Sequence, residues 1–99
     1  MKVILALALM CSLSTIVQAQ DVAQGKAKYA VCAACHGVEG QGAFGPKLQG
    51  QKPEIIVKKL TAYKNKQQVG AQSQIMWGIA GDLTSADINN IAAYTATLK

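Results

Sequence analysis

Two cysteines and a histidine lie close together in the segment "CAACH", which runs from Cys32 to His36. The pattern C-x-x-C-H is typical of a c-type haem attachment site, in which both sulfurs bond covalently to the porphyrin and the histidine ligates iron. The sequence therefore predicts one haem c, attached through Cys32 and Cys35, with His36 as the proximal iron ligand. The rest of the chain must then provide a pocket and a second axial ligand.

The candidate for the second ligand is Met76. It is the only methionine of the chain outside residues 1–19. A neutral methionine sulfur favours ferrous over ferric iron more than a second imidazole does, and so raises the reduction potential. Ordinary core packing is the alternative role for Met76, because most methionines have that role.

Other chemistry is open to the same three residues of the motif. A structural zinc site needs four ligands, usually as two separated pairs, whereas Cys32, Cys35 and His36 are three ligands in one short segment. A thioredoxin-like dithiol needs a βαβ surrounding, which the pattern of the chain does not resemble. A plain disulfide between Cys32 and Cys35 would leave His36 unexplained.

The N-terminus has the pattern of a secretory signal. Lys2 is followed by the apolar run "VILALALMC" and by the small-residue exit "VQAQ", with cleavage expected after Ala19. An uncleaved N-terminal anchor is the alternative. We therefore expect a signal peptide over residues 1–19 and one domain over residues 20–99. A domain of this size has a marginal core of its own, which a buried haem would supplement.

The charged residues are few and mostly basic. The whole chain carries a formal charge of +5 and has no arginine, so its cations are lysines. A lysine excess suits steering toward an acidic protein surface. Nucleic acid is a poor alternative, because the lysines are scattered along the chain and do not form a basic run.

Helical spacing of apolar residues predicts three helices and no strands. The first begins with Asp21 as its cap and places Val22, Gly25 and Tyr29 along one side. The second begins at Pro53. The third begins after Thr84, with Asp87 completing a capping-box-like pair.

Two segments between the expected helices are rich in glycine. The segment 37–52 is expected to be a loop that can wrap a large flat ligand, and a plain surface connection is its alternative. The segment "QIMWGIAGD" is expected to be a second such loop, which carries Met76 and Trp77.

The chain as a whole resembles a bacterial class I cytochrome c, close to the small monohaem proteins of the c-553 and c4 kind. The resemblance is carried by "GKAKYAVCAACHG", "GPKLQGQ", Met76 and "LTSADINNIAAY". It implies an all-α class I cytochrome c fold, with about three to five helices wrapped around one covalently attached haem. It also implies that Gly25 and Tyr29 contact Tyr94 where the first and last helices cross.

The same resemblance implies roles for four residues around the haem. The carbonyl of Pro46 would accept a hydrogen bond from His36, which fixes the imidazole tautomer. Leu48, Leu60 and Ile91 would pack on the macrocycle. Trp77 has no role that the resemblance assigns, and the chain lacks an arginine that related sequences often carry after the middle helix.

The function that this resemblance implies is electron transfer, not catalysis. We expect a periplasmic protein, monomeric, that passes single electrons from a quinol-oxidising complex to a terminal oxidase or peroxidase. Its partners would be redox proteins with acidic surfaces that dock at the haem edge, steered by lysines such as Lys47, Lys58 and Lys59. A membrane would be reached only through these partner complexes. The alternatives are a peroxidase or gas sensor with an open iron site, and an electron-entry subunit of a larger redox complex.

Overall fold

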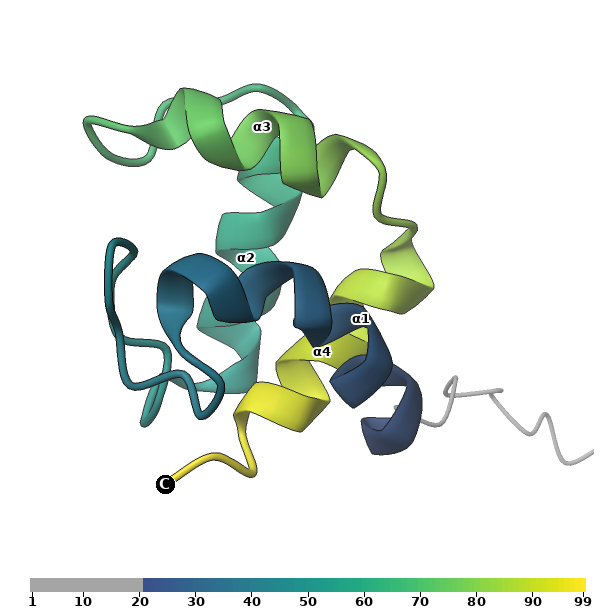
Figure 1. The fold of residues 1–99 in the computed structure, drawn as a ribbon. Helices are drawn as coiled ribbons and strands as arrows, with labels where there is room; N and C mark the ends of the chain where they lie inside the picture. The colour runs from purple at the N-terminus through teal and green to yellow at the C-terminus, as the bar shows by residue number, and fades with distance from the viewer. Residues whose placement is uncertain (1–20) are drawn as a thin grey trace, which may run out of the picture.

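The computed structural model describes residues 21–99, and the predicted signal segment 1–19 lies outside the described residues. Residues 21–99 form four helices and no strand (Figure 1). The helices are α1 (Val22–His36), α2 (Pro53–Lys64), α3 (Ser73–Gly81) and α4 (Ser85–Thr95). The predicted all-α fold is therefore confirmed. Within the described part of the chain, no helix has the length and apolar character needed to cross a membrane.

Helix α1 carries the whole attachment motif in its last two turns. The helix begins where the Asp21 side chain accepts a hydrogen bond from the Gln24 N–H, as the sequence predicts. It ends at Gly37, which has a positive φ of 89° that few other residues adopt. Because the helix continues to His36, both cysteines and the histidine are held on one rigid element.

Helix α1 crosses α4 at very close range. A Cβ atom on Gly25 would lie 1.9 Å from the carbonyl oxygen of Asn90, so only glycine fits there. The Tyr29 and Tyr94 rings pack with their centroids 5.3 Å apart, and the predicted contact of Gly25 and Tyr29 with Tyr94 is confirmed. Val22 does not share this buried face, because it is 42 % exposed.

One hydrogen bond links the start of α1 to α4, and a second stabilises the end of α1 itself. The Asp21 backbone N–H donates to the side-chain oxygen of Asn90 at 2.9 Å, which links the start of α1 to α4. The Tyr29 hydroxyl donates to the Gly37 carbonyl at 2.6 Å, at the end of the same helix. Burial raises the pKa of Tyr29, so its hydroxyl remains a donor at neutral pH.

Helices α2 and α4 start as the sequence predicts. Pro53 occupies the first turn of α2, where its missing N–H costs nothing. In α4, the Thr84 side chain accepts from the Asp87 N–H and the Asp87 carboxylate accepts from the Thr84 N–H, which completes a capping box. Ile56 and Leu60 form the buried face of α2.

The expectation of a loop around Met76 was wrong, because this segment forms α3. Gly78 and Gly81 made a helix look unfavourable, since glycine costs about 1 kcal/mol against alanine inside a helix. Packing of α3 on α2 offsets that cost: Ala80 is fully buried and Met76 packs against the main core. Tertiary contacts thus outweigh local propensity here.

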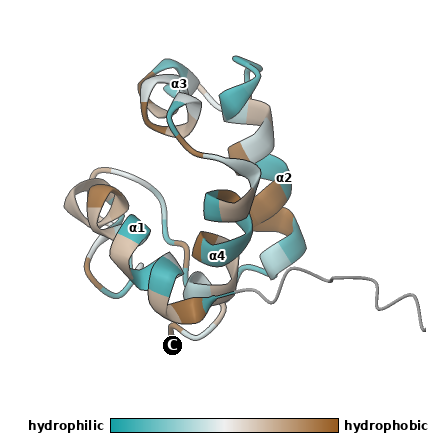
Figure 2. Ribbon diagram, turned by 90° about the vertical axis from the view of Figure 1, so that its right-hand side faces the viewer, coloured by the Kyte–Doolittle hydropathy of each residue, from teal (hydrophilic) through white to brown (hydrophobic). Residues whose placement is uncertain are grey.

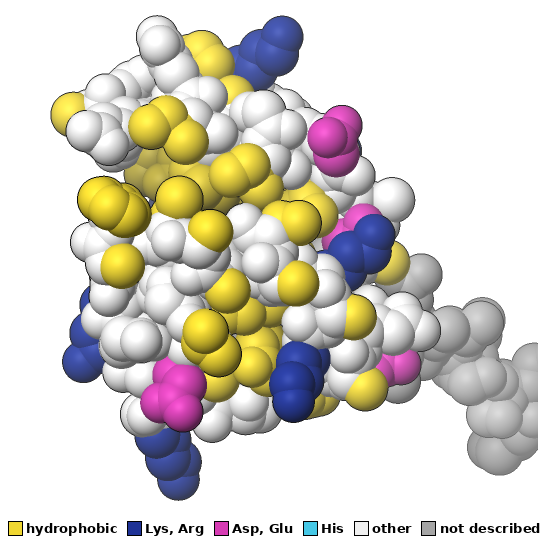
Figure 3. All heavy atoms as spheres, viewed as in Figure 1, with side chains coloured by type: hydrophobic (Ala, Val, Ile, Leu, Met, Phe, Trp, Pro, Cys, Tyr) yellow, Lys and Arg dark blue, Asp and Glu magenta, His cyan; other side chains and the backbone are white. Residues whose placement is uncertain are grey.

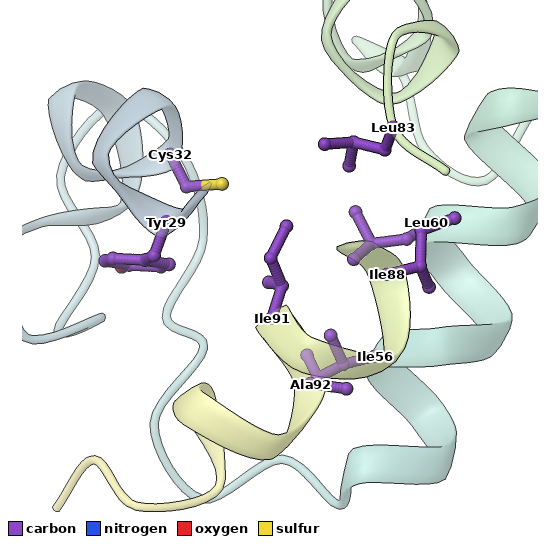
Figure 4. Close-up of a cluster of buried hydrophobic side chains, with 8 residues drawn as sticks. All are labelled: Tyr29, Cys32, Ile56, Leu60, Leu83, Ile88, Ile91 and Ala92. Atoms are coloured by element: carbon purple, nitrogen blue, oxygen red, sulfur yellow. The ribbon is translucent and has the colours of Figure 1, made fainter. Parts of the chain in front are cut away.

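The core lies where α1, α2 and α4 meet, and the side chains from these elements point toward one another in Figure 4. Brown, apolar residues are interspersed with teal, polar ones along the helices in Figure 2. The buried cluster contains Tyr29, Cys32, Ile56, Leu60, Leu83, Ile88, Ile91 and Ala92. Cys32 belongs to this cluster, so the attachment motif borders the core directly.

Candidate haem site

One cavity of about 430 Å³ collects every residue that the sequence analysis named for the haem site. The hollow lies below α3 in Figure 3, where yellow apolar side chains surround it. The predicted residues that line it are Cys32, Cys35, His36, Pro46, Leu48, Leu60, Met76 and Ile91. They come from all four helices and from the 37–52 loop, so the folded chain brings together residues that are far apart in sequence.

His36 is oriented by the loop that follows it. The residue is buried, and its Nδ1 lies 2.7 Å from the carbonyl oxygen of Pro46. A carbonyl can only accept a hydrogen bond, so Nδ1 carries the proton and Nε2 keeps a free lone pair. This tautomer is the one that a metal-ligating histidine needs.

Gly45 allows the same loop to lie in contact with the imidazole of His36. A Cβ atom at Gly45 would lie 2.7 Å from Cε1 of His36, so a larger residue would displace the ring. The Gly45 N–H donates to the Cys35 carbonyl at 2.6 Å, and the Gly42 N–H donates to the His36 carbonyl at 2.7 Å. The sequence analysis did not single out Gly45, although its place directly before Pro46 is a signal that could have found it.

The two cysteines are not joined by a disulfide, and they differ in exposure. Cys32 is buried and Cys35 is half-buried. Burial, with a smaller contribution from the neighbouring Cys35, raises the pKa of the Cys32 thiol to about 11. In the chain without haem this thiol is therefore neutral at neutral pH and packs as a small apolar group.

The remaining wall is largely apolar, with a few polar side chains from α2, α3 and the connecting segments. Ile56 and Ile79 line the cavity beside the predicted residues, and the sequence analysis did not name them. Lys59 also lines it, and its ammonium donates to the Gln51 side chain at 3.1 Å. A flat apolar group that carries carboxylates fits such a lining, because its acidic groups can lie near the lysine.

The mouth of the cavity is bordered by apolar side chains that remain exposed. Phe44 is 94 % exposed, Ile75 is 61 % exposed and Val31 is 58 % exposed, and all three line the opening. We call these three residues the apolar rim. Exposed apolar side chains gathered in one place are typical of a contact surface for another molecule.

The geometry disfavours the other chemistries considered for the motif. In residues 21–99, no group of three or more histidine, cysteine, aspartate or glutamate side chains is arranged to hold a metal ion, which argues against a zinc site. The described residues also lack the strands of a thioredoxin-like surrounding.

Comparison with known proteins identifies the family. The family model for cytochrome c matches residues 22–99. The chain belongs to the cytochrome c family. Cytochrome c-554(548) of Halomonas halodenitrificans is 38% identical over 78 residues, which cover 77% of this chain and 94% of that protein. Cytochrome c-554(547) of Halothiobacillus neapolitanus is 42% identical over 92 residues, which cover 82% of this chain and 100% of that protein.

A longer relative matches over part of its length. Cytochrome c4 of Pseudomonas aeruginosa is 35% identical over 101 residues, and the match covers 99% of this chain but 49% of that protein. The chain thus spans about half the length of this relative. The resemblance to bacterial class I c-type cytochromes is confirmed by these matches.

Family membership confirms the cofactor prediction. A cytochrome c domain implies one covalently bound haem c, and Cys32 and Cys35 with His36 have the spacing of the attachment motif. The cavity fits this group, because its lining is apolar and the imidazole tautomer is correct. The chain is a haem-based electron-transfer protein.

Proposed function

We propose that the protein is a periplasmic electron carrier whose haem iron is ligated by His36 and Met76. The observation that carries the proposal is that these two residues, from α1 and α3, line the same cavity together with both cysteines. As in the sequence analysis, its electrons would come from a quinol-oxidising complex and go to a terminal oxidase or peroxidase.

The chain's own residues set the conditions for electron transfer. The bound haem supplies an iron that gains or loses one electron. The Pro46 carbonyl holds the proton on Nδ1 of His36, which strengthens the imidazole as a ligand. Leu48, Leu60 and Ile91 exclude water from the cavity, which tunes the reduction potential. With His36 and Met76 holding it, the iron would have no open site for a substrate, so the proposed role is electron transfer and not catalysis.

Docking to redox partners would use charge at long range and apolar contact at short range. The excess of lysine attracts an acidic partner, and Lys58 and Lys59 lie on α2, the helix that forms one wall of the cavity. The apolar rim then meets the partner next to the haem. Transient redox encounters bury little area and are weak. The protein itself is expected to be a monomer in solution.

The rate of electron exchange with an acidic redox protein tests the steering. We expect the rate to fall as the ionic strength rises, because salt screens the attraction between exposed charges. Stopped-flow mixing at low and high salt measures this. A rate that is the same at both salt concentrations would show that the lysines do not steer.

The absorption spectrum tests the ligand set. The oxidised holoprotein is expected to show the weak red band that reports a methionine sulfur on ferric iron, and Met76→Ala is expected to lose it. Gln74→Ala is the matched control, because Gln74 is an exposed residue of the same helix that does not line the cavity, and this variant is expected to keep the band.

Two other results would contradict the proposal. Covalent haem without the band in the unaltered protein would mean an open or otherwise ligated iron, and would favour a peroxidase or gas sensor. Elution of the native protein inside a larger assembly, measured by size exclusion of a membrane extract, would favour an electron-entry subunit.

A further inference from the structure

Helix α3, which carries Met76, packs against α2. Its other side faces the cavity proposed for the haem, which Met76 and Ile79 line. In Figure 1, α3 lies above α2 and apart from α1. The helix that presents the sulfur therefore depends on its attachments to α2 and to the connection between them, residues 65–72.

The first attachment is made by Trp77, the residue after Met76. Its indole N–H donates to the carbonyl of Gln67 at 2.9 Å. That carbonyl is fixed in turn by the end of α2, where the Gln67 N–H donates to Ala62 and the Lys66 N–H donates to Tyr63. These two bonds are the helix-ending pattern that directs the chain out of α2. Trp77 thus connects the ligand-bearing helix to the rigid end of α2.

The second attachment is made by Ser73, at the start of α3. Its buried hydroxyl accepts from the N–H groups of Val69 at 2.8 Å and Gly70 at 2.7 Å, and donates to the Gly70 carbonyl. The Ser73 side chain therefore joins the end of the 65–72 connection to the first turn of α3. Met76 lies one turn further along the same helix.

The third attachment is at the other end of α3. The ammonium of Lys64, in the last turn of α2, donates to the carbonyls of Gly81 and Leu83. A cation at a helix C-terminus also interacts favourably with the helix dipole. Ser73 therefore holds α3 at its start, Trp77 holds it at its middle, and the contacts of Lys64 hold it at its end. We call these contacts the α3 clasp.

We propose that Trp77 and Ser73 are positioning residues, which hold the Met76 sulfur toward the haem iron through the α3 clasp. The inference rests on the proposed ligation of iron by Met76. Trp77 does not line the cavity, and Ser73 lines it with a hydroxyl that is already bonded to Val69 and Gly70. Each side chain therefore acts by fixing the helix on which the sulfur is carried. This gives Trp77 a role that the sequence analysis did not assign.

Binding of imidazole to the ferric holoprotein tests the clasp, because imidazole must displace Met76 before it ligates iron. Trp77→Phe keeps an aromatic ring but loses the N–H, and Ser73→Ala loses the hydroxyl. Losing a hydrogen bond of ordinary strength shifts the equilibrium between iron-bound and detached Met76 sulfur by about fivefold toward the detached state. We expect each variant to bind imidazole about fivefold more tightly than the unaltered protein, measured by loss of the red band.

Tyr94→Phe is the matched control, since it removes a hydroxyl from an aromatic residue at the α1–α4 crossing, away from α3. Its imidazole affinity is expected to be unchanged. Equal affinities in all four proteins would overturn the clasp while leaving Met76 as the ligand. An equal rise in all three variants would also overturn it, because the effect would then be general destabilisation. Absence of the red band from the unaltered protein would instead overturn the ligation itself.

Discussion

The two helices that present the proposed iron ligands are held in different ways. Helix α1, with His36, crosses α4 at a distance that leaves no room for a single carbon atom at Gly25. Helix α3, with Met76, borders the proposed haem cavity and is held to α2 by packing and by polar contacts at its middle and its C-terminal end. The histidine therefore belongs to the rigid framework, while the methionine lies on an attachment that can loosen without unfolding the core.

The largest expected effect comes from filling the close crossing of α1 and α4. Gly25→Ala would place its Cβ against the Asn90 carbonyl and force the two helices apart. We expect the free energy of unfolding to fall by about 3 kcal/mol, at the upper end of the cost of overpacking. Chemical denaturation monitored by circular dichroism measures it.

Gly78→Ala is the matched control on α3, because a Cβ atom there would meet nothing within 4 Å. This variant is expected to be about as stable as the unaltered protein, or more stable by up to about 1 kcal/mol, since alanine favours a helix. If both variants lost the same stability, the contrast between a tight crossing and a loosely held α3 would be wrong.

A smaller effect is expected from removing the capping box at the start of α4, the helix on which α1 packs. Hydrogen bonding to the Thr84 backbone, and to a lesser degree to its hydroxyl, together with nearby lysines, holds the pKa of Asp87 below its usual value. Asp87→Ala is expected to cost about 1 kcal/mol at pH 7.

The pH dependence has a definite sign. Because the pKa of Asp87 is lower in the folded chain than in the unfolded chain, its contribution is fully present above the unfolded value of about 3.9. The contribution is lost as the pH falls through the lower, folded value. The stability difference between Asp87→Ala and the unaltered protein should therefore shrink in acid, as measured by denaturation from pH 7 to pH 2. A difference that stays constant over this range would contradict the assignment.

The smallest effect is expected at the start of the connection to α3. Lys66 has a positive φ of 57°, which is strained for a residue with a side chain. Lys66→Gly should therefore raise the free energy of unfolding by about 0.5 kcal/mol, because glycine is the preferred residue at this position after a helix. Asn65→Gly, at the neighbouring position with a negative φ of −88°, is the control and should be neutral or destabilising. Thermal melts of both variants measure the difference.

The helices α1 and α4 could be predicted from the sequence, because the signals that mark them are local. Asp21 and the pair Thr84 and Asp87 mark where α1 and α4 begin, and the apolar spacing after each marks the buried face. The attachment motif indicates the haem by its pattern alone. The contact of Gly25 with Tyr94 needed the family resemblance, because no spacing rule says which helices cross.

The α3 side could not be predicted, because its determinants are distant in sequence and involve backbone atoms. The acceptors for Trp77 and Lys64 are carbonyl groups, which every residue has, so no residue type marks them in advance. Gly78 and Gly81 indicated a loop, since the packing of Ala80 that outweighs them exists only in the folded chain. Gly45, on the loop beside His36, is a separate case: its place before Pro46 was a usable signal, although its close contact with the imidazole exists only in the folded chain.

The hydrogen bond from Asp21 to Asn90 also has a kinetic consequence. Its two partners are 69 residues apart, and the close crossing at Gly25 needs the same segment of α4. Contacts of such long sequence separation form late, because the intervening chain must first be brought together. Helix α1 therefore lacks its docking partner until α4 has formed. Until then Cys32 is not packed in the core, so we expect its sulfur to remain accessible for attachment to haem.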